Sequence, residues 1–235
     1  MEPWFDTHVH LDAYPAEERG ALLRRAADAG VGAVLSVGDA VGPAVDGVRV
    51  YRAAGLHPLR SDEYAGTGTL ASLATGPSVV AIGETGFDRA GPPLKVQARV
   101  FEGHCAVAAK LGLALILHID EEWERIRGFL EAVGSLRVVR HYFTGPEEQA
   151  DWHAEHGHYL SLGKPLLRMP HLKEVAVSYP ADRLLVETDS YPLAGRTTEP
   201  RDTGAIGEAV ASAREWSMEH CREQLWTNSL RAFGL

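Results

Sequence analysis

The chain has 235 residues, of which 45% are hydrophobic, and a formal net charge of −9. This length allows a sizeable buried core and fits one α/β barrel or at most two small domains. The negative charge argues against the clustered basic residues that bind nucleic acid phosphates, but it does not exclude phosphate chemistry, because bound divalent cations reverse the local sign.

Only two cysteines occur, Cys105 and Cys221, and both lie in segments that are predicted to be helical. The sequence therefore has no disulfide framework and no cysteine-based zinc motif, and we expect buried, inert thiols. We find no secretion signal and no uncharged apolar run of about 18 residues. We expect a cytoplasmic protein with no membrane span and no obligate protein partner.

Short apolar segments alternate with amphipathic segments, a pattern typical of βα units around a parallel sheet. In chain order, the predicted elements are 4–10 (strand), 17–29 (helix), 33–37 (strand), 50–56 (strand), 64–73 (helix), 78–82 (strand), 95–111 (helix), 113–117 (strand), 121–133 (helix), 137–140 (strand), 146–156 (helix), 158–162 (strand), 169–178 (helix), 184–187 (strand), 204–218 (helix) and 222–233 (helix). Eight strands with intervening helices predict an α/β fold, a single (β/α)8 TIM barrel that takes up residues 1–235 as one domain.

The connection between the second and third predicted strands is too short for a full helix. It covers residues 38–48 and is broken by Gly42, Pro43 and Gly47. Parallel strands are usually joined by a crossover of about a dozen residues or more. We therefore predict a barrel whose second helix is shortened.

A His-x-His pair lies at the end of the first predicted strand, in Asp6-Thr7-His8-Val9-His10. Alternate side chains of a strand point to the same face, so both imidazoles can reach one ion. Neutral imidazole binds several divalent metals, and the pair by itself names none of them. Two polar residues at a frayed strand end would look the same, so the remaining ligands have to come from elsewhere in the chain.

Further polar residues recur at the ends of later strands. The full set is His8 and His10 at strand one, His57 at strand three, Glu84 at strand four, His118 at strand five, His141 at strand six and Asp189 at strand eight. The C-terminal ends of barrel strands meet at one face, where barrel enzymes carry their catalytic residues. Nitrogen and carboxylate ligands that converge on this face predict a metal site.

His57 differs from the other members of this set because Pro58 follows it and ends the strand. We interpret His57 as a substrate-binding residue, a donor to a substrate phosphate beside the metals. The alternative is a loop histidine that is merely held in place by Pro58. In neither interpretation is His57 a metal ligand.

With these residues the chain resembles the TatD-type metal-dependent hydrolases, the TatD family of deoxyribonucleases in the amidohydrolase superfamily. The matching stretches are Asp6-Thr7-His8-Val9-His10-Leu11-Asp12, Gly55-Leu56-His57-Pro58, Ile82-Gly83-Glu84-Thr85-Gly86-Phe87-Asp88, Leu117-His118, His141-Tyr142-Phe143-Thr144-Gly145, Glu187-Thr188-Asp189 and residues 228–235. They span the whole chain in order. The resemblance implies a divalent-metal-dependent phosphodiesterase that typically removes nucleotides from DNA ends.

The resemblance also implies a centre of two divalent ions, whose identity among Zn, Mn, Ni, Fe and Mg the sequence leaves open. The implied ligands are His8, His10 and Asp189 for one ion, His118 and His141 for the second, and Glu84 as a bridge between them. Such a pair activates water and polarises a phosphoryl group. Asp189 and Glu84 are the implied catalytic residues, with Asp189 as the general base that takes the proton of the attacking water.

Two stretches depart from the family pattern and leave the substrate open. His118 is followed by Ile119-Asp120-Glu121 where the family usually has a Ser-Arg-Asp run, so an acid replaces a potential phosphate-binding arginine. Thr198-Glu199-Pro200 stands in place of Asn-Glu-Pro. A hydrolase of a small amide, ester or phosphorylated metabolite is therefore an alternative, and a non-catalytic metal-binding barrel is a further one.

Three more histidines, His153, His156 and His158, cluster near the middle of the chain. They lie at the end of a predicted helix and the start of the next strand, away from the catalytic face of a barrel. We do not expect a metal site there.

Overall fold

Eight parallel strands form one sheet in sequence order in the computed structural model, which describes residues 1–38, 42–131, 133–195 and 198–235. The strands are β1 (Trp4–Val9), β2 (Val31–Val37), β3 (Arg49–Ala54), β4 (Val79–Asp88), β5 (Ala114–Asp120), β6 (Val138–Arg140), β7 (Tyr159–Leu162) and β8 (Leu184–Val186). Just beyond β8, Ser190 forms a parallel bridge with Val9, and its carbonyl accepts a 3.0 Å hydrogen bond from the His10 N–H. This bridge brings the two ends of the sheet together in a nearly closed barrel, which confirms the predicted (β/α)8 fold.

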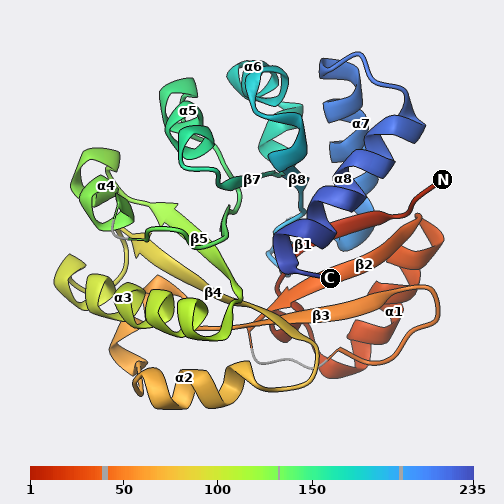
Figure 1. Cartoon of the computed structure of the whole chain (residues 1–235). Helices are drawn as coiled ribbons and strands as arrows, with labels where there is room; N and C mark the ends of the chain where they lie inside the picture. Colours follow the sequence, from red (N-terminus) through yellow and green to blue (C-terminus); the bar gives the residue numbers. More distant parts are fainter. Residues whose placement is uncertain (39–41, 132, 196–197) are drawn as a thin grey trace.

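The helices lie around the outside of the sheet, as Figure 1 shows. They are α1 (Ala16–Asp28), α2 (Thr67–Ala74), α3 (Leu94–Leu111), α4 (Trp123–Glu131), α5 (Glu147–Glu155), α6 (Pro170–Ser178), α7 (Thr203–Ala213) and α8 (Met218–Phe233). Within the described part of the chain, none of them combines the length and the apolar character that crossing a lipid bilayer requires.

The β2–β3 connection contains no helix in its described part. Residues 42–48 are non-helical and include an isolated antiparallel bridge between Val45 and Val48, while residues 39–41 lie outside the described ranges. The two strands pair in parallel from Ala33–Arg49 to Val37–Ala53. As far as the structure describes this connection, the predicted shortening of the second helix is confirmed, and α2 joins β3 to β4.

Local sequence sets the boundaries of the longest helix, α3. Pro93 directly precedes its first turn. Proline has no backbone N–H, but N–H groups at the start of a helix have no acceptor within the helix, so no hydrogen bond is lost. Gly112 ends it in the left-handed conformation with φ of 67°, which glycine adopts without steric cost. The predicted range of 95–111 therefore agrees closely with the observed helix.

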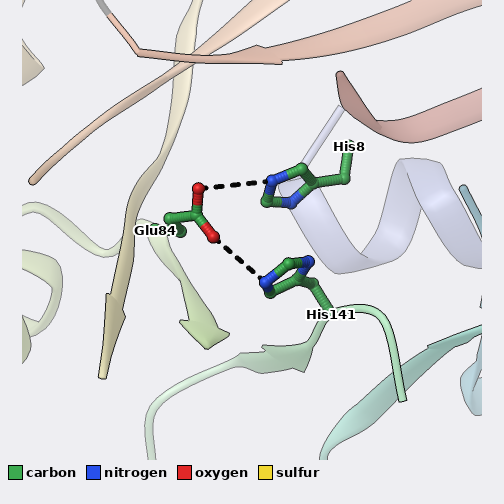
Figure 2. A group of neighbouring side chains, drawn as sticks. All are labelled: His8, Glu84 and His141. Carbon is green, nitrogen blue, oxygen red and sulfur yellow. Dashed lines mark ion pairs between the residues drawn. The ribbon is translucent and has the colours of Figure 1, made fainter. Parts of the chain in front are cut away.

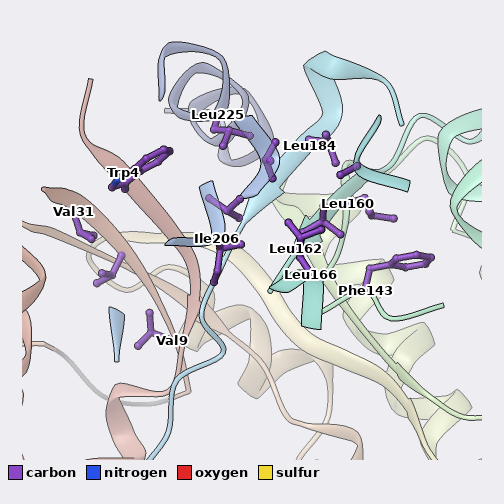
Figure 3. Packing of buried hydrophobic residues seen from close by; sticks show 14 of the residues in the cluster. Trp4, Val9, Val31, Phe143, Leu160, Leu162, Leu166, Leu184, Ile206 and Leu225 are labelled. Carbon is purple, nitrogen blue, oxygen red and sulfur yellow. The ribbon is translucent and has the colours of Figure 1, made fainter. Parts of the chain in front are cut away.

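The strand side chains alternate between the barrel interior and the layer beneath the helices. Leu35 of β2 belongs to a buried cluster with Ile116 of β5 and Leu185 of β8. Its neighbour Val34 instead belongs to a second cluster that includes Ile206 of α7. Figure 3 shows part of this second cluster, between the helices and the strands. Apolar packing thus fills the barrel and leaves the carboxyl ends of the strands to polar residues.

Candidate metal centre

The structure brings all seven predicted site residues together at the C-terminal end of the barrel. One cavity is lined by His10, His57, Glu84, His118, His141 and Asp189, and the buried His8 lies against Glu84. In one respect the prediction of strand ends was wrong, because His8, Glu84 and His118 lie inside β1, β4 and β5. No single element carries the set, so the site exists only in the closed barrel.

The position of Glu84 depends on a local irregularity of β4, which covers Val79–Asp88 instead of the predicted 78–82. The ladder with β5 changes register across Gly83 and Glu84. Gly83 has φ of 134°, and a Cβ there would lie 2.7 Å from the Ile116 carbonyl oxygen, so only glycine fits. The irregularity lets the strand continue past Glu84 while this side chain reaches both ligand groups.

One ligand group consists of His8, His10, Asp189 and one oxygen of Glu84. His8 Nε2 lies 3.3 Å from His10 Nε2 and 3.6 Å from Glu84 Oε1. His10 Nε2 lies 3.4 Å from Glu84 Oε1 and 3.2 Å from Asp189 Oδ1. Ligand atoms bound tetrahedrally at normal metal distances are about 3.3 Å apart. The two imidazoles and two carboxylates therefore fit one divalent ion.

The second oxygen of Glu84 faces the other ligand group. Glu84 Oε2 lies 3.0 Å from His141 Nε2 and 3.3 Å from His118 Nδ1, and these nitrogens are 3.0 Å apart. Figure 2 shows the Glu84 carboxylate between His8 and His141, with a different oxygen toward each. Oε2 is buried without a well-aligned hydrogen-bond partner among the described residues. A second cation would satisfy it, so the residues fit a pair of ions with Glu84 as the bridge.

The outer ring nitrogens of the second group face two carboxylates that were not among the predicted site residues. His118 Nε2 lies 3.3 Å from Asp88 Oδ2, and His141 Nδ1 lies 3.2 Å from Glu187 Oε1. Such a carboxylate fixes the tautomer and leaves the other ring nitrogen free for a metal. Asp88 and Glu187 both fall in stretches that match the TatD-type pattern, and this was the available signal.

Asp6 links β1 to the segment after β8. Its carboxylate accepts hydrogen bonds from the Thr188 N–H at 2.9 Å, the Thr188 hydroxyl at 2.5 Å and the His8 N–H at 3.3 Å. Burial raises the pKa of Asp6 to about 7, against the lowering effect of these bonds. The links hold His8 and Asp189, two ligands from opposite ends of the chain, next to each other.

Two residues of the centre have a left-handed backbone, which costs a non-glycine residue about 1 kcal/mol. Asp189 has φ of 49° and Tyr142 has φ of 45°. The Asp189 N–H donates to the His8 carbonyl at 3.0 Å, and the Tyr142 N–H donates to Glu187 Oε1 at 2.7 Å. These bonds hold the turns that present Asp189 and His141 to the cavity.

His57 has the geometry of a hydrogen-bond donor. Its Nδ1 accepts a 3.1 Å bond from the Leu59 N–H at the start of η2 (Pro58–Glu63). Burial lowers the pKa of His57 to about 4, so the ring is neutral and carries its proton on Nε2. This nitrogen lies 3.8 Å from Glu84 Oε2. Its ring centroid also lies 4.5 Å from that of His118, so the ring offers an N–H beside the second ligand group, in line with the interpretation of His57 as a substrate donor.

The charges of the centre stabilise one another. Burial disfavours the charged form of Glu84, but the surrounding histidines overcome this and hold its pKa well below the usual value. The pKa of Asp189 is lowered to about 2 because His10 and His8 outweigh the same burial effect. Burial also opposes protonation of His141, yet Glu187 and Glu84 raise its pKa to about 10. Without a metal both carboxylates thus stay ionised, as metal ligation requires, whereas His141 carries a proton that an ion would have to displace.

The cavity above the ligands has a volume of about 520 Å³ and a partly acidic rim. Asp12 lines it, and among the described lysines and arginines only Arg60 does so. Arg60 is half-exposed and forms an ion pair with Glu63. Asp120, which stands where the TatD-type pattern usually has an arginine, pairs with Arg89 at 3.3 Å. Arg60 is therefore the one described lysine or arginine at this cavity.

The histidine cluster of the middle of the chain is a buried hydrogen-bonded pair. His153 Nδ1 and His158 Nδ1 are 2.9 Å apart, and both rings are buried. His156 stacks on Trp152 with the ring centroids 3.8 Å apart. This group lies at the end of α5 and the start of β7, and no third metal ligand joins it within the described ranges.

The buried pair should make the stability of the protein depend on pH. Burial and the neighbouring His156 lower the pKa of His158 to about 4 from its usual value of 6.5. The unfolded chain takes up a proton below about pH 6.5 while folded His158 stays neutral, so the free energy of unfolding falls by about 2 kcal/mol between pH 7 and pH 5. Urea unfolding of the wild type and His158→Asn at both pH values measures this, and equal pH slopes would contradict it.

Comparison with known proteins places this geometry in context. A family model described as TatD related DNase matches residues 5–234. The 3'-5' ssDNA/RNA exonuclease TatD of Pantoea vagans is 34% identical over 260 residues, which cover 98% of this chain and 99% of the relative. The uncharacterized metal-dependent hydrolase TatD of Mycobacterium tuberculosis is 32% identical, over 98% of this chain and 97% of its own.

Solved structures show the same fold. The crystal structure of YjjV, a TatD homolog from Escherichia coli K12, superposes with a TM-score of 0.86 at 24% identity. The match covers 99% of this chain and 98% of that one. The barrel with its short β2–β3 connection is therefore a variant of an architecture already seen in a TatD homolog.

Proposed function

The chain belongs to the TatD family of metal-dependent hydrolases, and on that premise we propose that it is a two-metal nuclease that removes nucleotides from the ends of single-stranded DNA or RNA. The Pantoea vagans relative is named as a 3'-5' ssDNA/RNA exonuclease. One observation carries the proposal for this chain. The two oxygens of Glu84 face two separate ligand groups at the floor of one open cavity.

The residues around this cavity have distinct roles in the proposed reaction. When bound, two divalent ions would lower the pKa of water and neutralise charge on a phosphoryl group. Asp189 accepts the proton of the attacking water, since its pKa of about 2 keeps it ionised at neutral pH. His57 donates its Nε2 proton in a hydrogen bond to a phosphate oxygen. Glu84 holds the two ligand groups at a constant separation.

Reloading the metal-free protein with one metal at a time tests this proposal. Four imidazole nitrogens with two carboxylates suit Zn, Mn, Ni or Fe better than Mg, which prefers oxygen ligands. Each form is incubated with end-labelled single-stranded DNA, the matching RNA and bis-p-nitrophenyl phosphate. We expect stepwise release of mononucleotides from one end, together with cleavage of the small diester. Cleavage of neither substrate by a protein with two bound ions would overturn the proposal.

A second candidate is the hydrolysis of a small phosphorylated metabolite, ester or amide in the same centre. The partly acidic rim favours it, because Asp12 and Asp88 line the cavity and Arg60 is already paired with Glu63. Carboxylates at the rim repel a long polyanion more than a small substrate that contacts only the centre. Cleavage of small phosphate esters without cleavage of DNA or RNA would identify this candidate.

Arg60 provides a test of polynucleotide binding. Replacing Arg60 with glutamine should lower kcat/KM on DNA about fivefold. The slope of log(kcat/KM) against log[salt] should also become shallower by about 1, the value for one lost phosphate contact. Activity on bis-p-nitrophenyl phosphate should change little, because this diester has no neighbouring phosphate. The matched control is Arg89→Gln, an exposed arginine that pairs with Asp120 and does not line the cavity. An equal loss in both variants would contradict a specific role for Arg60.

A further inference from the structure

A buried arginine lies directly beside the second ligand group. Arg140 ends β6, and only 5% of its surface is exposed. Among the described residues no carboxylate forms a close ion pair with its guanidinium, although the charges of Glu187 and Asp120 favour it from a greater distance, and the Phe143 ring centroid lies 5.9 Å away. Burying a charge without a directly paired counter-charge is costly unless hydrogen bonds compensate for it. The hydrogen bonds of the Arg140 guanidinium therefore have to compensate for the cost of burying its charge.

The guanidinium donates to two main-chain carbonyls, one in β5 and one directly after β6. Arg140 Nη1 donates to the carbonyl of His141, and Nη2 donates to the carbonyl of Ile119 at 2.9 Å. Ile119 directly follows His118. Two donors of one rigid, planar group thus connect the backbone at the two ligand residues.

The connection comes where the backbone ladder between β5 and β6 runs out. The last paired residues of the two strands are Leu117 and Arg140, and the His141 N–H donates to the Leu117 carbonyl at 3.2 Å. Beyond this point no backbone pair joins β5 directly to β6 among the described residues, although β5 stays paired with β4 as far as Asp120. His118 Nδ1 and His141 Nε2 are 3.0 Å apart, so a small separation of the strand ends would open the ligand group.

We propose that Arg140 is a positioning residue that sets the spacing of His118 and His141 and thereby the affinity of the second ion. This inference rests on the two-ion centre of the proposed function. It assigns Arg140 no contact with substrate or with the ions. The guanidinium acts through the backbone at the two ligand residues. Glu187 orients the His141 ring itself, through the contact of its Oε1 with His141 Nδ1.

The direction in which the affinity for the second ion changes when Arg140 is replaced distinguishes a positioning role from a purely electrostatic one. A buried positive charge near a cation site weakens cation binding, so loss of the charge alone would strengthen the binding of the second ion. Loss of the two backbone links would weaken it. Partners that orient metal ligands typically change affinity by about 10- to 100-fold when they are removed.

The experiment measures the binding of Mn²⁺ and Zn²⁺ to metal-free protein by equilibrium dialysis and calorimetry. In Arg140→Met we expect one ion to bind as in the wild type and the other at least about tenfold more weakly. Arg140→Lys keeps the charge but not the planar fork, and it should weaken the same ion by a smaller factor. The control is Arg137→Met, since Arg137 also donates to carbonyls, those of Gly112 and Arg231, and does so before β6 begins.

Each outcome decides one of the two proposals. Two ions in the wild type, with unchanged or tighter binding of both in the Arg140 variants, would overturn the positioning role. The positioning role would also be overturned if Arg137→Met weakened the binding of both ions as much as Arg140→Met did. A general loss of stability would explain that result. Fewer than two ions in the wild type would contradict the two-ion centre itself. If Arg140→Met does not fold, Arg140→Lys provides the same comparison.

Discussion

Glu84→Gln is expected to reduce kcat/KM at least about 10³-fold, or ~4 kcal/mol of transition-state stabilisation. The amide is neutral and has a single oxygen, whereas the carboxylate offers Oε1 to His8 and His10 and Oε2 to His118 and His141. The metal-free protein should then bind fewer than two ions. Metal analysis of the dialysed variant and kcat/KM on end-labelled DNA measure the two effects.

The matched control for Glu84→Gln is Glu124→Gln, the same chemical change at an exposed residue of α4. It should leave both metal content and kcat/KM unchanged. A Glu84→Gln protein that binds two ions and cleaves at the wild-type rate would show that Glu84 is not the bridge.

Asp189→Asn is expected to lower kcat about 10²- to 10⁴-fold, the range of a lost general base. The carboxylate has a pKa of about 2 and is ionised at neutral pH, whereas the amide cannot accept a proton. The asparagine oxygen can still face His10, so the ion beside it should bind more weakly without being lost. Single-turnover rates at saturating metal, with metal content determined on the same samples, separate the lost base from the weakened site.

The control for Asp189→Asn is Asp182→Asn, an exposed carboxylate in the turn before β8. It should have wild-type kinetics. Wild-type turnover by Asp189→Asn with two bound ions would contradict the assignment of Asp189 as the base.

The barrel and the composition of its centre could be predicted because both depend on periodic patterns. Parallel strands all end at one face of a barrel, so His118 after one apolar run and His141 after another must approach each other. The same argument brings Asp189 to the His8-Val9-His10 pair, although about 180 residues separate them in the sequence. The closure of β8 on β1 through Ser190 and Val9 is the contact that makes this true.

The residues that support the ligands could not be predicted in the same way. Asp88 and Glu187 read as ordinary acids near strand ends, and only the folded chain shows that they face the ring nitrogens of His118 and His141. Arg140 reads as one more strand residue. Such hydrogen bonds depend on side-chain geometry between neighbouring strands, and the hydrophobic pattern of a sequence carries no information about that geometry.

The sequence by itself predicted the kind of centre, because residue types that suit metal ligands recur toward the carboxyl ends of its apolar β segments, although His8, Glu84 and His118 lie inside their strands. Tertiary structure alone decided how the ligands are shared. The irregularity at Gly83 turns one carboxylate, Glu84, toward two ligand groups, and a backbone distortion of this kind has no signature in residue periodicity. The tertiary structure also decided which charges line the rim of the cavity, because loop conformation determines which charges reach a substrate. Arg60 lines the cavity, whereas Asp120 pairs with Arg89.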